Sequence, residues 1–539
     1  LPDEPLIFLK PSTAVIGTGA SIVIPADAGR VDYEAEVGVV IGRTARNVPA
    51  ARAHEYVLGL TCVNDVTDRD LQRRDVQYTR AKGFDTFAPV GPCIAACDLD
   101  RSIAVESRIN GERRQHSSTR ELIFPIRRLV EFVTAVMTLL PGDIISTGTP
   151  PGVGPIVPGD RVAIVADLPT ARSLVEQHPD ARVMGGPRCI VTPGFVNAHQ
   201  HLTGDRLIRS CIPDYIQARE AIFDWVVPVH AAHTGDDDEL SATLSLLEAV
   251  GNGITTTVEA GTVAHPERVA RAFERVGVRG TVGTWGWDVG DGPFAADTDD
   301  VLERQQSVLD SWPTGGLVEG WVTLVGHDLA SDRLFSDAAD MARAAGTGLT
   351  FHMSPSPDDG VAFSERSGKR PIHHLADLGV LGPGTLIAHA VHIDEREMSL
   401  LLDTRTAIAY CPWAYLRLGQ GVTGAGHHVD FLRQGGRLAL GCDTENAGDA
   451  IDAVRVGALA TGLARDMSCD PTVFGAHEAL ELMTIGGAEA IGMGDRIGSL
   501  EVGKAADLVV HDLSGVGSTP NAVDPALQLL WAGDGRAVR

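Results

Sequence analysis

Two histidines separated by one residue, His199 and His201, follow the apolar run 189–191 and the turn 192–194. Residues i and i+2 of a β-strand lie on the same face. Both imidazoles would therefore point the same way from one strand end, an arrangement that suits a divalent cation of the zinc or iron class. Two ordinary surface histidines would show the same spacing, so this pair alone does not indicate a metal site.

A second pair of chemistry-bearing residues lies near the start of the chain. Glu34 and Glu36 are also two residues apart and lead into the apolar run 37–41, and Asp65 follows later. Three carboxylates form a hard oxygen site of the Mg²⁺ or Mn²⁺ type. Lys82 and Thr149 would hold a 2-oxo acid whose enolate the cation stabilises. The alternative is an edge strand with solvated glutamates.

The elements that must position these residues differ between the two halves. Residues 1–168 contain short apolar runs punctuated by glycine and proline, at 21–25, 36–41, 143–146 and 161–165, and one clear helix near 126–140. This pattern indicates a mainly β domain. Residues 169–188 read as a join, and from residue 189 strands alternate with helices such as 239–250, 267–276 and 336–344.

Eight strand candidates follow in order in the second half: 189–196, 254–260, 280–285, 318–325, 349–353, 385–391, 407–411 and 438–442. Eight strand–helix repeats over residues 189–490 are typical of a (β/α)8 barrel of the TIM type. An open doubly wound sheet is the alternative. The barrel is favoured because polar residues recur at the carboxyl ends of the strands, where barrels build their sites.

Four further polar residues lie at these strand ends: His327 after the fourth strand, His352 on the fifth, His389 on the sixth and Asp443 after the eighth. With His199 and His201, they predict a mononuclear site with an open position for water. The cation would lower the pKa of that water, and a carboxylate would take its proton and pass it to the leaving group.

Each of these residues also has an ordinary interpretation. His352 alone would be a core histidine, and Asp443 alone could cap a helix. His392 reads as a surface residue and is left out of the ligand set, and His230 and His233 read as structural. The joint pattern is what points to a metal centre.

Composition narrows the possible functions. The 539 residues carry a net charge of −26, which argues against binding to nucleic acid or an anionic membrane. The eight cysteines form no CxxC pair, which predicts reduced thiols and a cytoplasmic protein. No apolar run is long enough for a membrane span, and Leu1 is not followed by a signal sequence. A small-molecule substrate is expected.

Residues 193–201, PGFVNAHQH, resemble the opening motif of the amidohydrolase superfamily, in its cytosine deaminase and chlorohydrolase-like branch. Residues 497–509, IGSLEVGKAADLV, resemble the same family's return from the barrel to a small β-sandwich, here 491–539 and shorter than the family's. The resemblance covers residues 185–539. It implies a site for Zn²⁺ or Fe²⁺ held by the residues His199, His201, His352 and Asp443. It also implies His389 as acid/base or additional ligand, Asp443 as the base, and His327 beside the substrate.

The chain departs from that family at three places. Pro355 stands where a deaminase usually has a proton-shuttling glutamate, and Glu445 could replace it. The seventh-strand motif begins with Tyr410 instead of histidine. No lysine on the fourth strand could be carbamylated, which favours one metal ion. The missing glutamate argues against deamination, whereas hydrolysis by a metal-activated water does not depend on it.

Residues 8–12 (FLKPS), 84–89 (FDTFAP) and 141–143 (PGD), with the carboxylates described above, resemble the fumarylacetoacetate hydrolase family. The resemblance covers residues 1–168. It implies Glu34, Glu36 and Asp65 as ligands of Mg²⁺ or Mn²⁺, with Lys82 and Thr149 binding substrate. The family's catalytic His and Glu would precede Leu1. We therefore expect metal binding without cleavage of a C–C bond.

These observations predict a metal-dependent amidohydrolase that cleaves a C–N bond in an amide, cyclic amidine or heteroaromatic amine by metal-activated water, fused to a fumarylacetoacetate hydrolase-like domain. One alternative is Mg²⁺-dependent isomerisation, decarboxylation or hydrolysis of a 2-oxo acid by the N-terminal domain. Another is a metal-binding scaffold without activity. Both families resembled here commonly form homo-oligomers, which are expected for this chain too.

Overall fold

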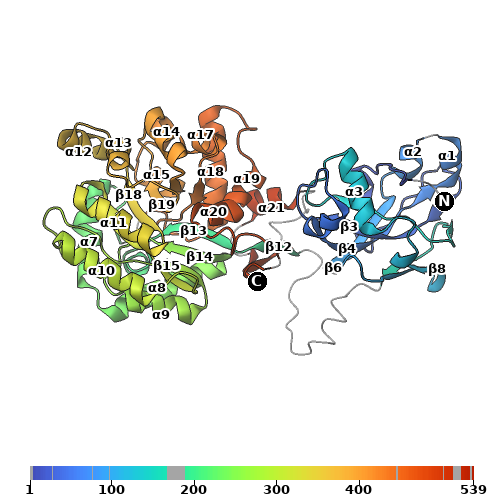
Figure 1. The fold of residues 1–539 in the computed structure, drawn as a ribbon, viewed down its shortest axis with the longest axis horizontal. Coiled ribbons are helices and arrows are strands. Elements are labelled where there is room, and N and C mark those ends of the chain that lie inside the picture. The colour runs from blue at the N-terminus through green and yellow to red at the C-terminus, as the bar shows by residue number, and fades with distance from the viewer. Residues whose placement is uncertain are drawn as a thin grey trace. The chain divides into compact units, whose positions relative to one another are not determined.

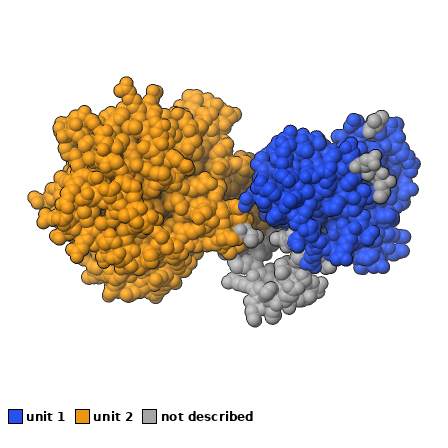
Figure 2. Space-filling view, viewed as in Figure 1, with its two compact units in different colours: residues 1–183 blue, residues 184–539 orange. Residues whose placement is uncertain are grey.

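The computed structural model describes residues 4–26, 28–75, 77–95, 98–166, 189–209, 211–444, 447–501, 503–513, 524–533 and 537–538 (Figure 1). The predicted join at 169–188 and Glu445 lie outside the described residues. The chain divides into two compact units, Leu1–Val183 and Met184–Arg539 (Figure 2).

The first unit is mainly β, as predicted. Its largest sheet runs β1-β6-β4-β3-β9, and two three-stranded sheets run β10-β2-β5 and β11-β7-β8. The strands are β1 Val15–Ile16, β2 Val31–Tyr33, β3 Ala35–Ile41, β4 Val57–Asn64, β5 Thr67–Asp68, β6 Ala88–Ala95, β7 Ala104–Ile109, β8 Glu112–Ser118, β9 Ile144–Ser146, β10 Gly154–Pro155 and β11 Val162–Ala166. The helices are η1 Ser12–Ala14, η2 Ala50–Glu55, α1 Arg69–Arg74, α2 Thr79–Lys82, η3 Thr119–Glu121 and α3 Ile126–Val136.

Helix α3 covers the large sheet of this unit, because its apolar face packs in one buried cluster with side chains of β3 and β4. The predicted helix 126–140 was too long. Residues after Val136 turn to extended backbone, where Leu139 forms a bridge with Ala45. The apolar run 21–25 does not form a strand: Pro25 has no N–H to donate, and the Val23 N–H donates to the Thr86 hydroxyl rather than to a neighbouring strand.

The second unit is a barrel of the predicted TIM type. Parallel strands form two sheets, β13-β14-β15-β16 and β17-β18-β19-β20-β21. Only Trp321 separates β16 from β17, and a parallel bridge from Gln200 to Asp443 joins the other two edges. The strands are β13 Phe195–Gln200, β14 Ile254–Glu259, β15 Arg279–Val282, β16 Val318–Gly320, β17 Val322–Gly326, β18 Leu349–Met353, β19 Thr385–His389, β20 Ala407–Tyr410 and β21 Leu438–Leu440.

Helices surround this barrel (Figure 1), and the longer ones bury an apolar face. In α9, Val269, Ala270 and Phe273 are buried. The helices are α5 Asp205–Ile208, α6 Ala218–Glu220, the π-helical η4 Ala221–Val226, α7 Val227–Ala232, α8 Gly235–Gly251, α9 Pro266–Val276, α10 Thr298–Ser311, η5 His327–Leu329, α11 Asp332–Ala345, α12 Asp358–Ser367, α13 Pro371–Asp377, α14 Glu395–Thr404, α15 Pro412–Arg417, α16 Val422–Ala425, α17 His428–Arg433, α18 Ala453–Ser468, α19 Ala476–Met483, α20 Ile485–Ala490 and α21 Pro525–Ala532. Among the described residues, none of the helices is both long and apolar enough to cross a membrane.

The predicted first strand, 189–196, is two strands. β12 (Cys189–Pro193) pairs antiparallel with β22 (Leu508–Asp512) outside the barrel, and β13 begins at Phe195. The chain changes direction at Gly194, where a Cβ atom would lie 1.9 Å from the Thr255 hydroxyl oxygen. Only glycine fits this close approach.

The pairing of β12 with β22 predicts a pH effect on stability. Burial lowers the pKa of His511 from 6.5 to about 4, and His511 Nε2 lies 2.9 Å from the Thr192 hydroxyl. Because the unfolded chain binds the proton more tightly, the free energy of unfolding falls as the pH drops from 6.5 toward 4, by up to ~3 kcal/mol. Urea unfolding of wild type and His511→Gln at about pH 7.5 and about pH 5 measures this. An equal pH dependence in the two proteins would contradict it.

Candidate metal centres

Five predicted side chains meet at the carboxyl ends of the barrel strands. His199 lies on β13 with His201 just after it, His352 lies on β18, His389 ends β19, and Asp443 follows β21; all five are buried. The His199 ring lies 5.1 Å from that of His201, 4.8 Å from that of His352 and 5.4 Å from that of His389, between centroids. Asp443 Oδ1 lies 3.7 Å from His199 Nε2 and 3.5 Å from His201 Nε2.

Hydrogen bonds from neighbouring groups orient the rings of two of these histidines. His352 Nδ1 lies 2.8 Å from the Val325 carbonyl oxygen, which can only accept, so Nδ1 carries the proton and Nε2 keeps its lone pair. His201 Nδ1 lies 2.9 Å from the Thr262 hydroxyl. Such partners fix the ring orientation of metal-binding histidines. The sequence pattern did not indicate Thr262, because threonine is common in strands and nearby loops.

Unsatisfied polar atoms test whether a cation fits here. Both ring nitrogens of His199 and Nδ1 of His389 are buried and have no hydrogen-bond partner among the described residues. Burial, followed by the neighbouring imidazoles, lowers the pKa of His199 and of His389 well below the usual range, so these rings are neutral. His201 Nε2 and His352 Nε2 are 3.2 Å apart, close to the ~3.3 Å between two nitrogens on one tetrahedral zinc. The donor set therefore fits zinc or iron.

The backbone at this end of the barrel is strained. His327, His389, Asp443 and Thr444 have φ values of +52°, +81°, +63° and +70°, in the left-handed region that non-glycine residues rarely adopt. The surroundings enforce this geometry: His428 Nε2 donates to the His389 carbonyl at 2.6 Å. Strain of this kind concentrates at functional sites.

His327 lies beside the cluster, its ring 5.8 Å from that of His352. Its Nδ1 is 2.8 Å from the Asp359 carboxylate, which also accepts a bond from the Ser354 N–H at 2.6 Å. Burial disfavours the charged ring, but the Asp359 carboxylate outweighs burial and raises the pKa of His327. Sequence reasoning missed Asp359, for which the only signal was its position seven residues after His352.

A cavity of about 140 Å³ opens beside these residues. Apart from the predicted histidines and Asp443, its described lining is mostly apolar: Ile222, Phe223, Val226, Val227, Trp285, Trp287, Val325, Leu329, Pro355, Leu418 and Ala447, with Thr262, Gln420 and Thr444. Sequence reasoning did not find these residues, because apolar residues in loops carry no spacing signal.

Three other histidines stay outside the cluster. His392 Nε2 contacts the Gln420 carbonyl oxygen at 2.7 Å, His230 lies on α7 near the Thr203 hydroxyl, and His233 pairs with Asp238. This placement agrees with leaving them out of the ligand set. The predicted Glu445 lies outside the described residues, so the structure says nothing of its position.

The first unit brings its three predicted carboxylates together. Glu34 precedes β3, Glu36 lies on β3 and Asp65 follows β4; all are buried, with ligand atoms within 4.8 Å of one another. They line a cavity of about 870 Å³. This donor set fits Mg²⁺ or Mn²⁺.

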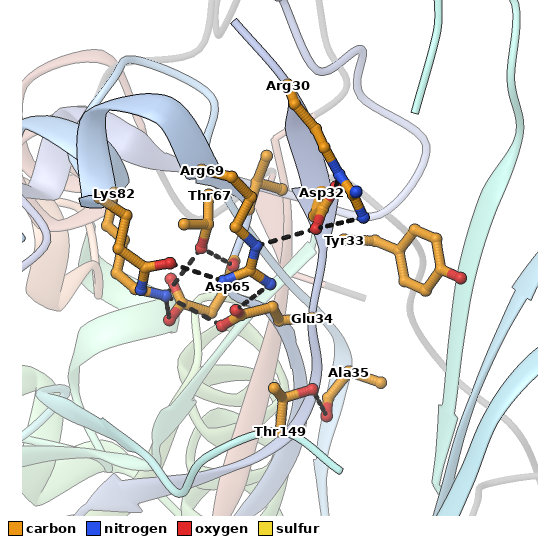
Figure 3. Close-up of polar contacts among 12 residues, drawn as sticks. Arg30, Asp32, Tyr33, Glu34, Ala35, Asp65, Thr67, Arg69, Lys82 and Thr149 are labelled. Carbon is orange, nitrogen blue, oxygen red and sulfur yellow. Dashed lines mark hydrogen bonds and ion pairs between the residues drawn. The ribbon is translucent and has the colours of Figure 1, made fainter. Parts of the chain in front are cut away.

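Cationic side chains neutralise these carboxylates (Figure 3). Lys82 Nζ donates to Glu34 at 2.9 Å and to Asp65 at 2.5 Å, and Arg69 pairs with Glu34 at 2.6 Å. Lys10 donates to Asp65 at 2.6 Å. Glu36 accepts from the Ser146 hydroxyl and the Gly148 N–H, yet burial, with the charge of Asp65, raises its pKa to about 8.

The two residues predicted to hold substrate, Lys82 and Thr149, both line this cavity, but their polar groups have different partners. Lys82 lines the cavity, but its ammonium group is held by the carboxylates and by the Thr67 hydroxyl. Thr149 also lines the cavity, where its hydroxyl donates to the Ala35 carbonyl and accepts from Gln115. Sequence reasoning missed Lys10 and Arg69, whose pairing with the carboxylates depends on distant segments.

Comparisons with known proteins match both units. Residues 190–534 match the amidohydrolase family, and residues 1–176 match the C-terminal domain of fumarylacetoacetate hydrolase. An uncharacterized protein of Archaeoglobus fulgidus is 54% identical over 164 residues, which are 30% of this chain and 66% of that protein. The chain thus spans just under two thirds of the length of that relative.

Two solved structures resemble the larger unit. An adenosine deaminase of Xanthomonas campestris with bound zinc is 26% identical, with a TM-score of 0.62, over 70% of this chain and 83% of that one. An atrazine chlorohydrolase of Arthrobacter aurescens in complex with zinc is 23% identical, with a TM-score of 0.60, over 67% and 86%. At that identity the second likeness concerns the fold alone.

Proposed function

The chain belongs to the amidohydrolase family through residues 190–534 and carries a fumarylacetoacetate hydrolase domain in residues 1–176, and from this we propose that the barrel hydrolyses a C–N bond with the help of one divalent cation. The supporting observation is the buried cluster of neutral imidazoles beside the Asp443 carboxylate, with polar atoms that lack partners among the described residues. His199, His201, His352 and Asp443 would hold the ion, with His389 as a further ligand or acid/base.

The bound cation would supply acidity to a water molecule and polarise the substrate. Asp443 is the carboxylate beside the imidazoles and can take a proton from water there. Its strained φ of +63° and the hydrogen bond from the Asp443 N–H to the His199 carbonyl at 2.9 Å fix its position.

His327 would act on the side of the leaving group. The Asp359 carboxylate raises the pKa of His327, so His327 can hold a proton and donate it to the nitrogen that departs. His327 lines the same cavity as Asp443. The leaving group would be an amine or ammonia from an amide, a cyclic amidine or a heteroaromatic amine.

Turnover of a substrate panel tests this proposal. The full chain, loaded with zinc, is incubated with heteroaromatic amines, cyclic amidines and amides, and released ammonia or amine is measured. We expect turnover that disappears after chelation and returns with zinc. Tight retention of zinc without turnover over the whole panel would instead support a scaffold without activity.

A second function is favoured by the first unit, where Glu34, Glu36 and Asp65 line a large cavity. Such a carboxylate site, loaded with Mg²⁺, suits enolisation of a 2-oxo acid. Mg²⁺-dependent tautomerisation of an oxo-acid that is lost in Glu34→Ala/Glu36→Ala would support it.

A further inference from the structure

His389 differs from two other imidazoles of the barrel cluster in what orients its ring. The rings of His201 and His352 are each held by a hydrogen bond at Nδ1. By contrast, Nδ1 of His389 is buried and has no hydrogen-bond partner among the described residues. A ring without such a partner takes its direction from its own backbone and from the side chains packed against it. The position of the His389 ring therefore depends on the peptide that carries it.

The peptide between His389 and Ala390 is strained and is held on both sides. The two residues have φ values of +81° and +49°, in the left-handed region that non-glycine residues rarely adopt. His428 Nε2 donates to the His389 carbonyl at 2.6 Å, and the Tyr415 hydroxyl lies 3.5 Å from the same oxygen. On the other side of the peptide, the Ala390 N–H donates to the Met353 carbonyl at 2.9 Å. Without the contacts to its carbonyl, the peptide would relax toward ordinary backbone and turn the ring with it.

The two side chains that hold this carbonyl are themselves fixed and buried. A carbonyl can only accept, so His428 carries its proton on Nε2. The His428 ring stacks on Tyr410, with centroids 4.2 Å apart and planes 22° apart. The Tyr415 hydroxyl accepts from the Cys411 N–H at 2.8 Å, and the Tyr415 ring meets the His389 ring edge to face at 5.6 Å. Tyr410 is the residue at which the seventh-strand motif departs from the family pattern, so these contacts give that departure a structural role.

We propose, on the basis of the proposed function, that His428 and Tyr415 are positioning residues that hold the His389 ring against the barrel cation. Neither is among the residues that line the cavity beside the cluster, and both act through His389. The His389 ring lies 5.4 Å from the rings of His199 and His352, so a turn of its peptide would carry its nitrogen away from the other ligands. Outer partners of this kind raise the affinity for a metal because they fix its ligands before it binds.

Metal binding by the full chain tests this proposal without any substrate. Competition with a chelator gives the zinc dissociation constant, and the visible spectrum of the Co²⁺-loaded chain reports the coordination geometry. His428→Phe keeps a ring against Tyr410 but has no N–H, so we expect zinc to bind ~10-fold more weakly or worse, with an altered cobalt spectrum. His428→Gln, whose amide can donate, should recover a zinc affinity within ~3-fold of wild type. Wild-type zinc affinity in a folded His428→Phe chain would overturn the proposal.

A double-mutant cycle separates positioning from a general loss of stability. Because His428 acts through His389, the double variant His389→Ala/His428→Phe should bind zinc as weakly as His389→Ala alone. A further ~10-fold loss in the double variant would mean that His428 acts independently of His389 and would refute the proposal. The matched control is His427→Phe, at the half-buried neighbouring position, which should bind zinc and cobalt as wild type does.

Tyr415→Phe removes a single oxygen atom and tests the second contact, also in the event that His428→Phe does not fold. We expect its cobalt spectrum to change in the same direction as that of His389→Ala, by a smaller amount. A spectrum identical to wild type would refute the role of Tyr415. Altered metal binding in these variants, without turnover of any amine or amide by the wild-type chain, would leave the positioning role standing and count against the proposed hydrolysis.

Discussion

Replacement of His199 and His201 together by alanine is expected to remove tightly bound zinc or iron from the chain and to reduce hydrolysis to background. The two imidazoles come from one strand end and lie next to Asp443, so their loss leaves His352 and His389 as the only predicted imidazole ligands. Metal affinity depends steeply on ligand number, because each ligand removes part of the cost of dehydrating the ion.

Elemental mass spectrometry after gel filtration measures this directly. We expect about one zinc or iron per wild-type chain and less than ~0.1 in the double variant. The matched control is Glu34→Ala/Glu36→Ala, which alters the other buried cluster and should keep the zinc. Zinc retained in the histidine variant, or lost only in the glutamate variant, would place the transition-metal site elsewhere in the chain.

The barrel could be predicted because the same strand–helix pattern repeats along the sequence. Eight short apolar runs separated by helical patterns indicate one architecture, and polar residues at the ends of strands must converge at the mouth of a barrel. This is why His199, His352 and His389, far apart in the sequence, were expected together and lie together in the structure.

The predictions from the sequence were wrong or incomplete where one contact between distant segments decides the local structure. Gly194 breaks the first predicted strand because Thr255 leaves no room for a side chain, and a single sequence does not show that neighbour. Likewise, nothing in the sequence places the Lys82 ammonium between Glu34 and Asp65, or His428 against the His389 carbonyl. These contacts depend on packing between distant segments, and such packing leaves no periodic pattern in the sequence.

The substitution Asp443→Asn is expected to lower kcat by ~10²–10⁴-fold, because an amide of the same shape cannot accept the proton that the carboxylate takes from water. The neighbouring imidazoles are neutral, and Asp443 is the carboxylate beside them. Among the described residues, Asp443 is the carboxylate within ligand distance of these imidazoles, whereas the Asp359 carboxylate is bound to His327 Nδ1.

Metal content separates the two roles of Asp443 as ligand and as base. If zinc stays near one per chain while kcat falls, the carboxylate acts chiefly as the base; if both fall together, it acts chiefly as a ligand. Asp337→Asn, on the surface of α11, is the control and should change neither. Near-normal kcat with full zinc in Asp443→Asn would mean that another group takes the proton, and Glu445 would then be the next residue to substitute.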